Sequence, residues 1–85
     1  MRYRKAIIDY LNEIDSPAIQ DNNLMDRVRE REEQSKDMFN IIVEQQKAHE
    51  KVDEIQDFME KVRVLNRITM EANSIVMRDL VLTPL

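Results

Sequence analysis

Neither glycine nor proline occurs between Ala18 and Thr83, and this absence constrains the fold more than any other feature of the sequence. Glycine normally supplies the positive φ angles of tight turns and lets the backbone approach a bound phosphate closely. Its absence excludes most nucleotide-binding folds. Because no helix-breaking residue interrupts this segment, a single helix of about 60 residues is allowed.

The length of the chain predicts one small domain that needs a partner. A chain of 85 residues forms at most a single domain, 1–85, whose core supplies only roughly 3–5 kcal/mol of stability. There is no cysteine, so no disulfide can add to that stability. Charged residues make up 35% of the chain and apolar residues 42%, a balance typical of amphipathic helices. We therefore expect a helical protein that assembles with itself or with another protein.

The net charge of -4 argues against nucleic acid as a ligand, because nucleic-acid binding depends on a basic surface. No apolar run approaches the eighteen or so residues of a membrane span. The absence of cysteine is compatible with a reducing compartment. These features predict a soluble, cytoplasmic protein without a membrane span.

The apolar residues recur at helical spacing and predict an all-α fold. A short helix is expected over 1–15. Residues 16–23 form a linker, in which Ser16 can cap a new turn and Pro17 can occupy its first position. Two longer helices are expected over 24–48 and 51–82.

The stretch QQKAHEKVDE, residues 45–54, leaves the connection between the two longer helices open. A short polar loop near His49 would produce a helical hairpin. Without glycine, asparagine or proline, however, the helix can also continue and form a long coiled-coil-like rod. In either arrangement the chain is expected to assemble into an oligomeric bundle.

The polar run REREEQSKD, residues 29–37, interrupts the apolar stripe of the helix expected over 24–48. Such a run usually forms a solvated helix face. We expect this helix to be less well packed at that point.

The last helix carries two rows of apolar residues, which predicts neighbours on two sides. The main row comprises Ile55, Phe58, Met59, Val62, Leu65, Ala72, Val76 and Leu80. The second row comprises Val64, Ile68, Ile75 and Leu82. Met70 and Met77 lie near the edge of this broad apolar surface, and methionine suits surfaces that accommodate different partners.

This surface predicts a small non-enzymatic interaction protein, an adaptor, a regulator or a chaperone-like protein, that binds an amphipathic helix of a partner protein. The residues expected to contact the partner are Val64, Ile68, Met70, Ile75, Met77 and Leu82. The alternative is a homo-oligomeric coiled-coil module in which the two apolar rows meet copies of the same chain.

Three polar residues lie within the apolar surface of the last helix: Asn66, Thr69 and Asn73. A polar side chain at a helix seam can select the register and the number of chains in a bundle. We therefore assign these residues to oligomer register. The alternative is that the seam shifts locally and leaves these three residues in water.

The sequence contains no convincing catalytic or cofactor site. His49, Glu50 and Asp53 resemble part of a helical zinc motif, but the chain has no second histidine and no cysteine to complete the ligand set. Slim helices also rarely form the concave site in which paired carboxylates act as acid and base. We expect no enzymatic activity, no metal, no cofactor and no small-molecule substrate.

Overall fold

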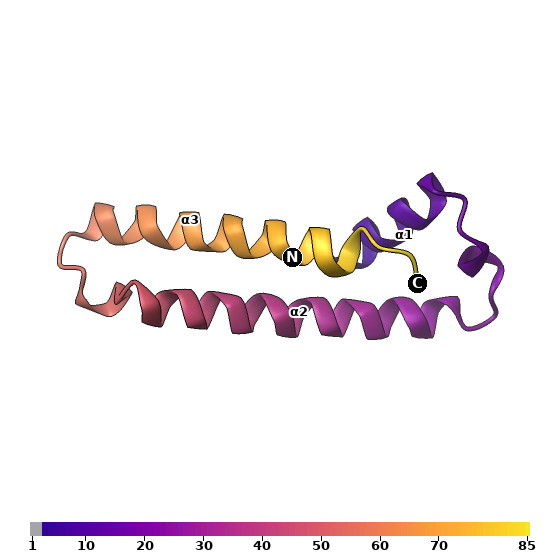
Figure 1. Ribbon diagram of the computed structural model, residues 1–85, viewed down its shortest axis with the longest axis horizontal. Coiled ribbons are helices and arrows are strands. Elements are labelled where there is room, and N and C mark those ends of the chain that lie inside the picture. The colour runs from indigo at the N-terminus through magenta and orange to yellow at the C-terminus, as the bar shows by residue number, and fades with distance from the viewer. Residues whose placement is uncertain (1–2) are drawn as a thin grey trace.

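The computed structural model describes residues 3–85 and shows an all-α fold, which confirms the predicted class. Its helices are α1 (Tyr3–Glu13), α2 (Leu24–His49) and α3 (Phe58–Val76). The 3₁₀ turns η1 (Pro17–Gln20) and η2 (Val52–Glu54) lie in the connections, and the π-helical turn η3 (Met77–Val81) extends α3. α2 and α3 form an antiparallel hairpin, with α1 packed on α2 and η3 at its open end (Figure 1). The chain therefore turns back and does not form one continuous helix.

The reversal between α2 and α3 takes place in residues 50–57 without a glycine. Lys51 adopts φ 52° and ψ 48°, the left-handed conformation that glycine usually occupies. Val52 follows it and is only 1% exposed, so its side chain closes the end of the hairpin. Burial of Val52 stabilises a turn that the local sequence does not favour.

The start of α3 differs from the predicted start of the last helix at residue 51. The carboxylate of Asp57 accepts hydrogen bonds from the backbone N–H groups of Met59 and Glu60 at 2.9 and 3.2 Å. These bonds satisfy donors that the first turn of a helix leaves free. The last helix therefore begins at Phe58, and its signal in the sequence is an aspartate followed three residues later by glutamate.

The left-handed Lys51 leads to a prediction about stability. We expect Lys51→Gly to raise the free energy of unfolding by about 0.5–1 kcal/mol, because glycine lacks the Cβ that makes this conformation unfavourable. Urea unfolding followed by circular dichroism measures the change. Lys51→Ala is the control: it removes the charge but keeps the Cβ, and should leave stability nearly unchanged. Equal effects of the two variants would contradict the explanation.

The main hydrophobic core lies where α1 meets the open end of the hairpin. It comprises Tyr3, Ile7, Leu11, Val28, Val76 and Val81, all nearly inaccessible to solvent. The α1 members recur every four residues, so one face of this helix is buried. The core thus joins the first helix to both helices of the hairpin.

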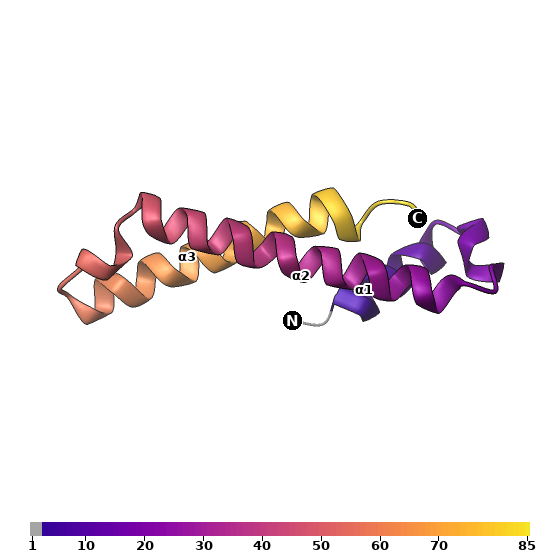
Figure 2. The ribbon, with the colours of Figure 1, turned by 90° about the horizontal axis from the view of Figure 1, so that it is seen from below.

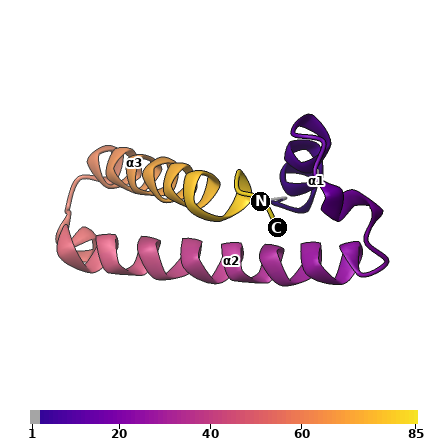
Figure 3. The same ribbon diagram turned by 45° about the vertical axis from the view of Figure 1, so that its right-hand side comes forward.

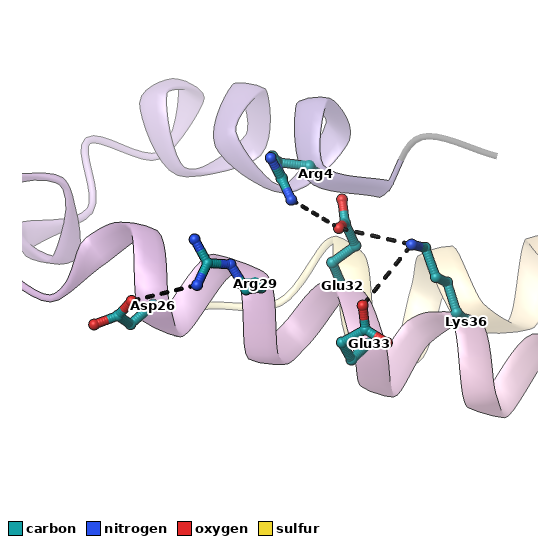
Figure 4. Close-up of polar contacts among 6 residues, drawn as sticks. All are labelled: Arg4, Asp26, Arg29, Glu32, Glu33 and Lys36. Carbon is teal, nitrogen blue, oxygen red and sulfur yellow. Dashed lines mark hydrogen bonds and ion pairs between the residues drawn. The ribbon is translucent and has the colours of Figure 1, made fainter.

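An ion-pair network also joins α1 to α2 (Figure 4). Arg4 Nη2 lies 3.1 Å from Glu32 Oε1, and Lys36 Nζ lies 3.8 Å from the same oxygen. Glu32 belongs to the polar run of α2, yet its side chain is only 10% exposed. The two cations compensate for the burial of this carboxylate.

The polar run also holds the end of the chain. Arg31 Nη1 donates hydrogen bonds to the carbonyl oxygen of Leu80 and to Oγ1 of Thr83, both at 2.6 Å. Ser35 is fully buried and donates to the carbonyl oxygen of Arg31 at 2.8 Å. The expected solvated face is therefore partly a packing face, because α1 and the C-terminal segment supply polar partners for it.

The molecule is long and thin, with extents of 52 × 19 × 16 Å. Its radius of gyration is 15.9 Å, whereas a compact chain of this length has a value of about 12 Å. α2 and α3 cross at a shallow angle (Figure 2), and α1 lies beside only the open end of the hairpin (Figure 3). We call residues 40–69 the distal half of the hairpin. Beyond Asn40 and Ile42, which lie beside Tyr3 and the main core, α2 and α3 pack there against each other and η2.

Candidate interaction surface

α1 packs on α2 and η3, and Tyr3 at its start reaches α3. The hydroxyl of Tyr3 donates a hydrogen bond to Asn73 Oδ1 at 3.2 Å. Burial raises the pKa of the Tyr3 phenol, so this group remains protonated and able to donate. The hydrogen bond between Tyr3 and Asn73 marks the position along α3 that the start of α1 reaches.

The side of α3 that Tyr3 contacts at Asn73 continues toward the turn, beyond the reach of α1. Phe58, Val62, Leu65 and Thr69 precede Asn73 at spacings of four, three, four and four residues, so they form one stripe along α3. Phe58 is 74% exposed, and Val62 and Leu65 are half-buried. This stripe lies beside the fully buried row of Ile68, Ala72 and Val76.

A matching stripe runs along α2. Glu32 contacts Arg4 of α1, and the same side of α2 continues through Lys36, Phe39 and Val43 at spacings of four, three and four residues. A hollow of about 230 Å³ lies at the end of α1. Its lining consists of Tyr3, Lys36, Phe39 and Asn40.

We call these two uncovered stripes together the distal groove. It comprises Val43, Phe58, Val62, Leu65 and Thr69, and at its start Phe39, which is half-buried against the main core. From Asn73 to Phe58 it follows fifteen residues of α3, which corresponds to a length of about 22 Å. Such a groove can hold about four turns of another helix, in the position that α1 occupies at the other end.

The arginines on the polar side of α3, away from the distal groove, are paired within the chain. Arg67 bonds to Glu50 across the hairpin and lies 3.5 Å from Glu71, and the hydrogen bond to Glu50 raises the pKa of its guanidinium. Arg63 lies 3.2 Å from Glu60. Because these charges already have partners, exposed apolar side chains dominate the surface left for recognition.

The six residues predicted to contact a partner do not form one surface. Ile68 is fully buried and Val64 is half-buried, so Ile68 belongs to the core of the hairpin, and its contact with a partner stays a prediction. Met70 is 71% exposed, and it lines a shallow depression together with Ile75. This depression lies on the other side of the buried row from Phe58.

The remaining two predicted contact residues lie near the end of α3. Met77 is half-buried against the main core and is therefore occupied within the chain. Leu82 is 44% exposed. The partner contacts predicted from the sequence did not include Phe39, Val43 and Phe58. These residues lie at helical spacing from residues that contact α1, and this relation becomes apparent only in the folded chain.

The three residues assigned to oligomer register have different surroundings. Asn66 and Thr69 are exposed, and Thr69 belongs to the distal groove. Asn73 is half-buried and accepts the hydrogen bond from Tyr3. Asn73 therefore has a partner within the chain, and its role in oligomer register stays a prediction, as do those of Asn66 and Thr69.

Within residues 3–85, no three histidine, aspartate or glutamate side chains come together to hold a metal ion. His49 is exposed at the end of α2. No helix in the same residues is long and apolar enough to cross a membrane. Comparisons of the chain with protein-family models, with curated proteins and with solved structures gave no match.

Proposed function

We propose that this chain is a small non-enzymatic interaction protein whose distal groove binds an amphipathic helix. One observation carries the proposal: the α3 stripe that begins at Asn73, the contact of Tyr3, continues beyond the start of α1 for about 22 Å to the exposed Phe58. Recognition of a helix in a groove uses apolar anchors at spacings of three and four residues, which the α3 stripe provides. Such a protein would act as an adaptor, a regulator or a chaperone-like protein.

The large accessible surface area of the chain supports the proposal that another protein segment occupies the groove. The chain exposes 6158 Å², whereas a compact protein of its mass exposes about 5,300 Å². Phe58 and Met59, at the start of α3, are 74% and 67% exposed. Large apolar side chains gathered at one end of a small protein are typical of an interaction site. Binding there would leave the core at the open end of the hairpin unchanged.

Photo-crosslinking in cells that express the full chain tests the proposal. A benzoyl-phenylalanine at position 58 is expected to form a covalent adduct with a protein that occupies the groove. The control places the same group at Arg63, which is 76% exposed on the polar side of α3. Adduct from position 58 but not from position 63 supports the function. No adduct from either position, or equal adducts from both, would refute it.

A further inference from the structure

We infer that the occupant of the distal groove is a second copy of this chain, packed antiparallel about a two-fold axis. The inference rests on the proposed function and names its partner. In this arrangement the two distal halves form a four-helix bundle, with the α1 helices at its two ends. Each copy contributes the same residues, as a two-fold interface requires.

The geometry of the groove places a large side chain opposite a hollow. The groove begins at the hollow lined by Tyr3 and Phe39 and ends at Phe58. When two such grooves overlap antiparallel, the end of one lies over the beginning of the other. Phe58 of each copy then meets the hollow of about 230 Å³ in its partner. A cavity of about 150 Å³ is large enough to hold benzene, so the hollow can accept this ring.

Charge also favours the antiparallel pairing. Five acidic and two basic residues lie between residues 50 and 61, around the turn of the hairpin. At the other end of the groove Lys36 lines the hollow, and the cations Arg4, Lys5 and Lys36 are paired with Glu32 and Asp9 within the chain. Antiparallel overlap places the acidic turn of each copy over this charge-paired end of the other. Parallel overlap would bring the two acidic turns together, which is unfavourable.

The surface available matches that of a standard dimer. The chain exposes about 850 Å² more than a compact protein of its mass. A stable protein interface buries about 800 Å² on each partner. One contact with a second copy would thus bring the exposed surface close to that of a compact protein.

Sedimentation equilibrium of the purified full chain is the first test. We expect twice the monomer mass at higher concentrations, and at least a hundred-fold weaker dimerisation for Phe58→Glu, because the charge would enter the partner's hollow. Met70→Glu is the matched control, since Met70 is 71% exposed on the other side of the buried row. It should leave dimerisation unchanged. A monomer up to millimolar concentration, or equal weakening by both variants, would overturn the inference.

Disulfide formation tests the antiparallel direction, because the chain has no cysteine of its own. Asn40 lines the hollow and is exposed. We expect an equimolar mixture of Phe58→Cys and Asn40→Cys chains to form a covalent dimer on mild oxidation. Phe58→Cys alone should form little, because the two Phe58 residues lie at opposite ends of the interface. Efficient dimer from Phe58→Cys alone would refute the antiparallel pairing.

The failure of this inference is distinguishable from failure of the proposed function. A monomer in sedimentation, together with an adduct between position 58 and a different protein in cells, would overturn the second copy as occupant and leave the groove's function in place. A monomer in sedimentation, together with no adduct in cells, would overturn both the inferred dimer and the proposed function.

Discussion

Ile68→Ala is expected to lower the free energy of unfolding by about 3 kcal/mol, because Ile68 is fully buried between the helices of the hairpin. The truncation removes apolar contacts and leaves a cavity that the helices can close only in part. In a chain whose whole stability is roughly 3–5 kcal/mol, this loss unfolds a large fraction of the molecules. Urea unfolding at a fixed protein concentration, followed by circular dichroism, measures it.

Met70→Ala is the matched control for this substitution. Met70 lies two residues further along α3 but is 71% exposed, so its truncation should change stability by less than about 0.5 kcal/mol. The two variants also separate two roles for Ile68. If Ile68→Ala left stability unchanged and abolished the adduct from position 58, Ile68 would be a partner contact and not a core residue.

Ile7→Ala is expected to cost a similar amount, about 2–4 kcal/mol, and to release α1 from the hairpin. Ile7 is 1% exposed and belongs to the core that joins α1 to Val28 of α2 and Val76 of α3. α1 has only eleven residues, and isolated helices of this length are marginal in water. Once undocked it should therefore lose its helical structure.

Hydrogen exchange measures the release of α1 directly. In Ile7→Ala the amides of α1 should exchange faster, while those in the distal half of the hairpin change less. Ile14→Ala is the control, because Ile14 is 40% exposed after the end of α1 and the same atoms are removed. Equal exchange rates in the two variants would show that Ile7 does not hold α1 in place.

The proposed dimer gives α1 a second role. α1 contacts the two stripes where they begin, at Glu32 and Asn73, and the second copy would cover their continuation in the distal half. Arg4 and Lys36 both contact Glu32 within the chain, and Tyr3 and Lys36 line the hollow that would receive Phe58 of the partner. Docking of α1 would thus prepare the binding site, so Ile7→Ala should also weaken dimerisation.

Local sequence signals were sufficient for the class of fold and for the first connection. The absence of glycine, together with apolar residues at spacings of three and four, predicts helices throughout. Ser16 and Pro17 mark the start of η1, where Ser16 Oγ accepts a hydrogen bond from the backbone N–H of Ala18 at 3.2 Å. Both signals act between residues close in the chain, so they can be read from the sequence.

The turn at Lys51 and the side of α3 that is buried were decided by tertiary structure. Periodicity shows that Ile68 and Ile75 share a row, and that Phe58, Val62 and Leu65 share another, but it does not say which row faces α2. Packing buries Ile68 of the first row together with Ala72 and Val76, which belong to the row of Phe58, and leaves Phe58 itself exposed, so the buried face lies between the two rows. The burial of Val52 offsets the unfavourable conformation of Lys51, a compensation that exists only after the two helices meet.

The polar run of α2 shows most clearly which features follow from the sequence and which depend on tertiary contacts. From sequence alone, Glu32 and Ser35 belong to a solvated face, because charged and hydroxyl side chains normally remain in water. In the folded chain Arg4 reaches Glu32 from α1, and the carbonyl oxygen of Arg31 accepts the hydrogen bond from Ser35. The sequence by itself determined which segments are helical and which residues share a helix face. Only the tertiary structure decided what covers each face, because that depends on contacts between residues far apart in the chain.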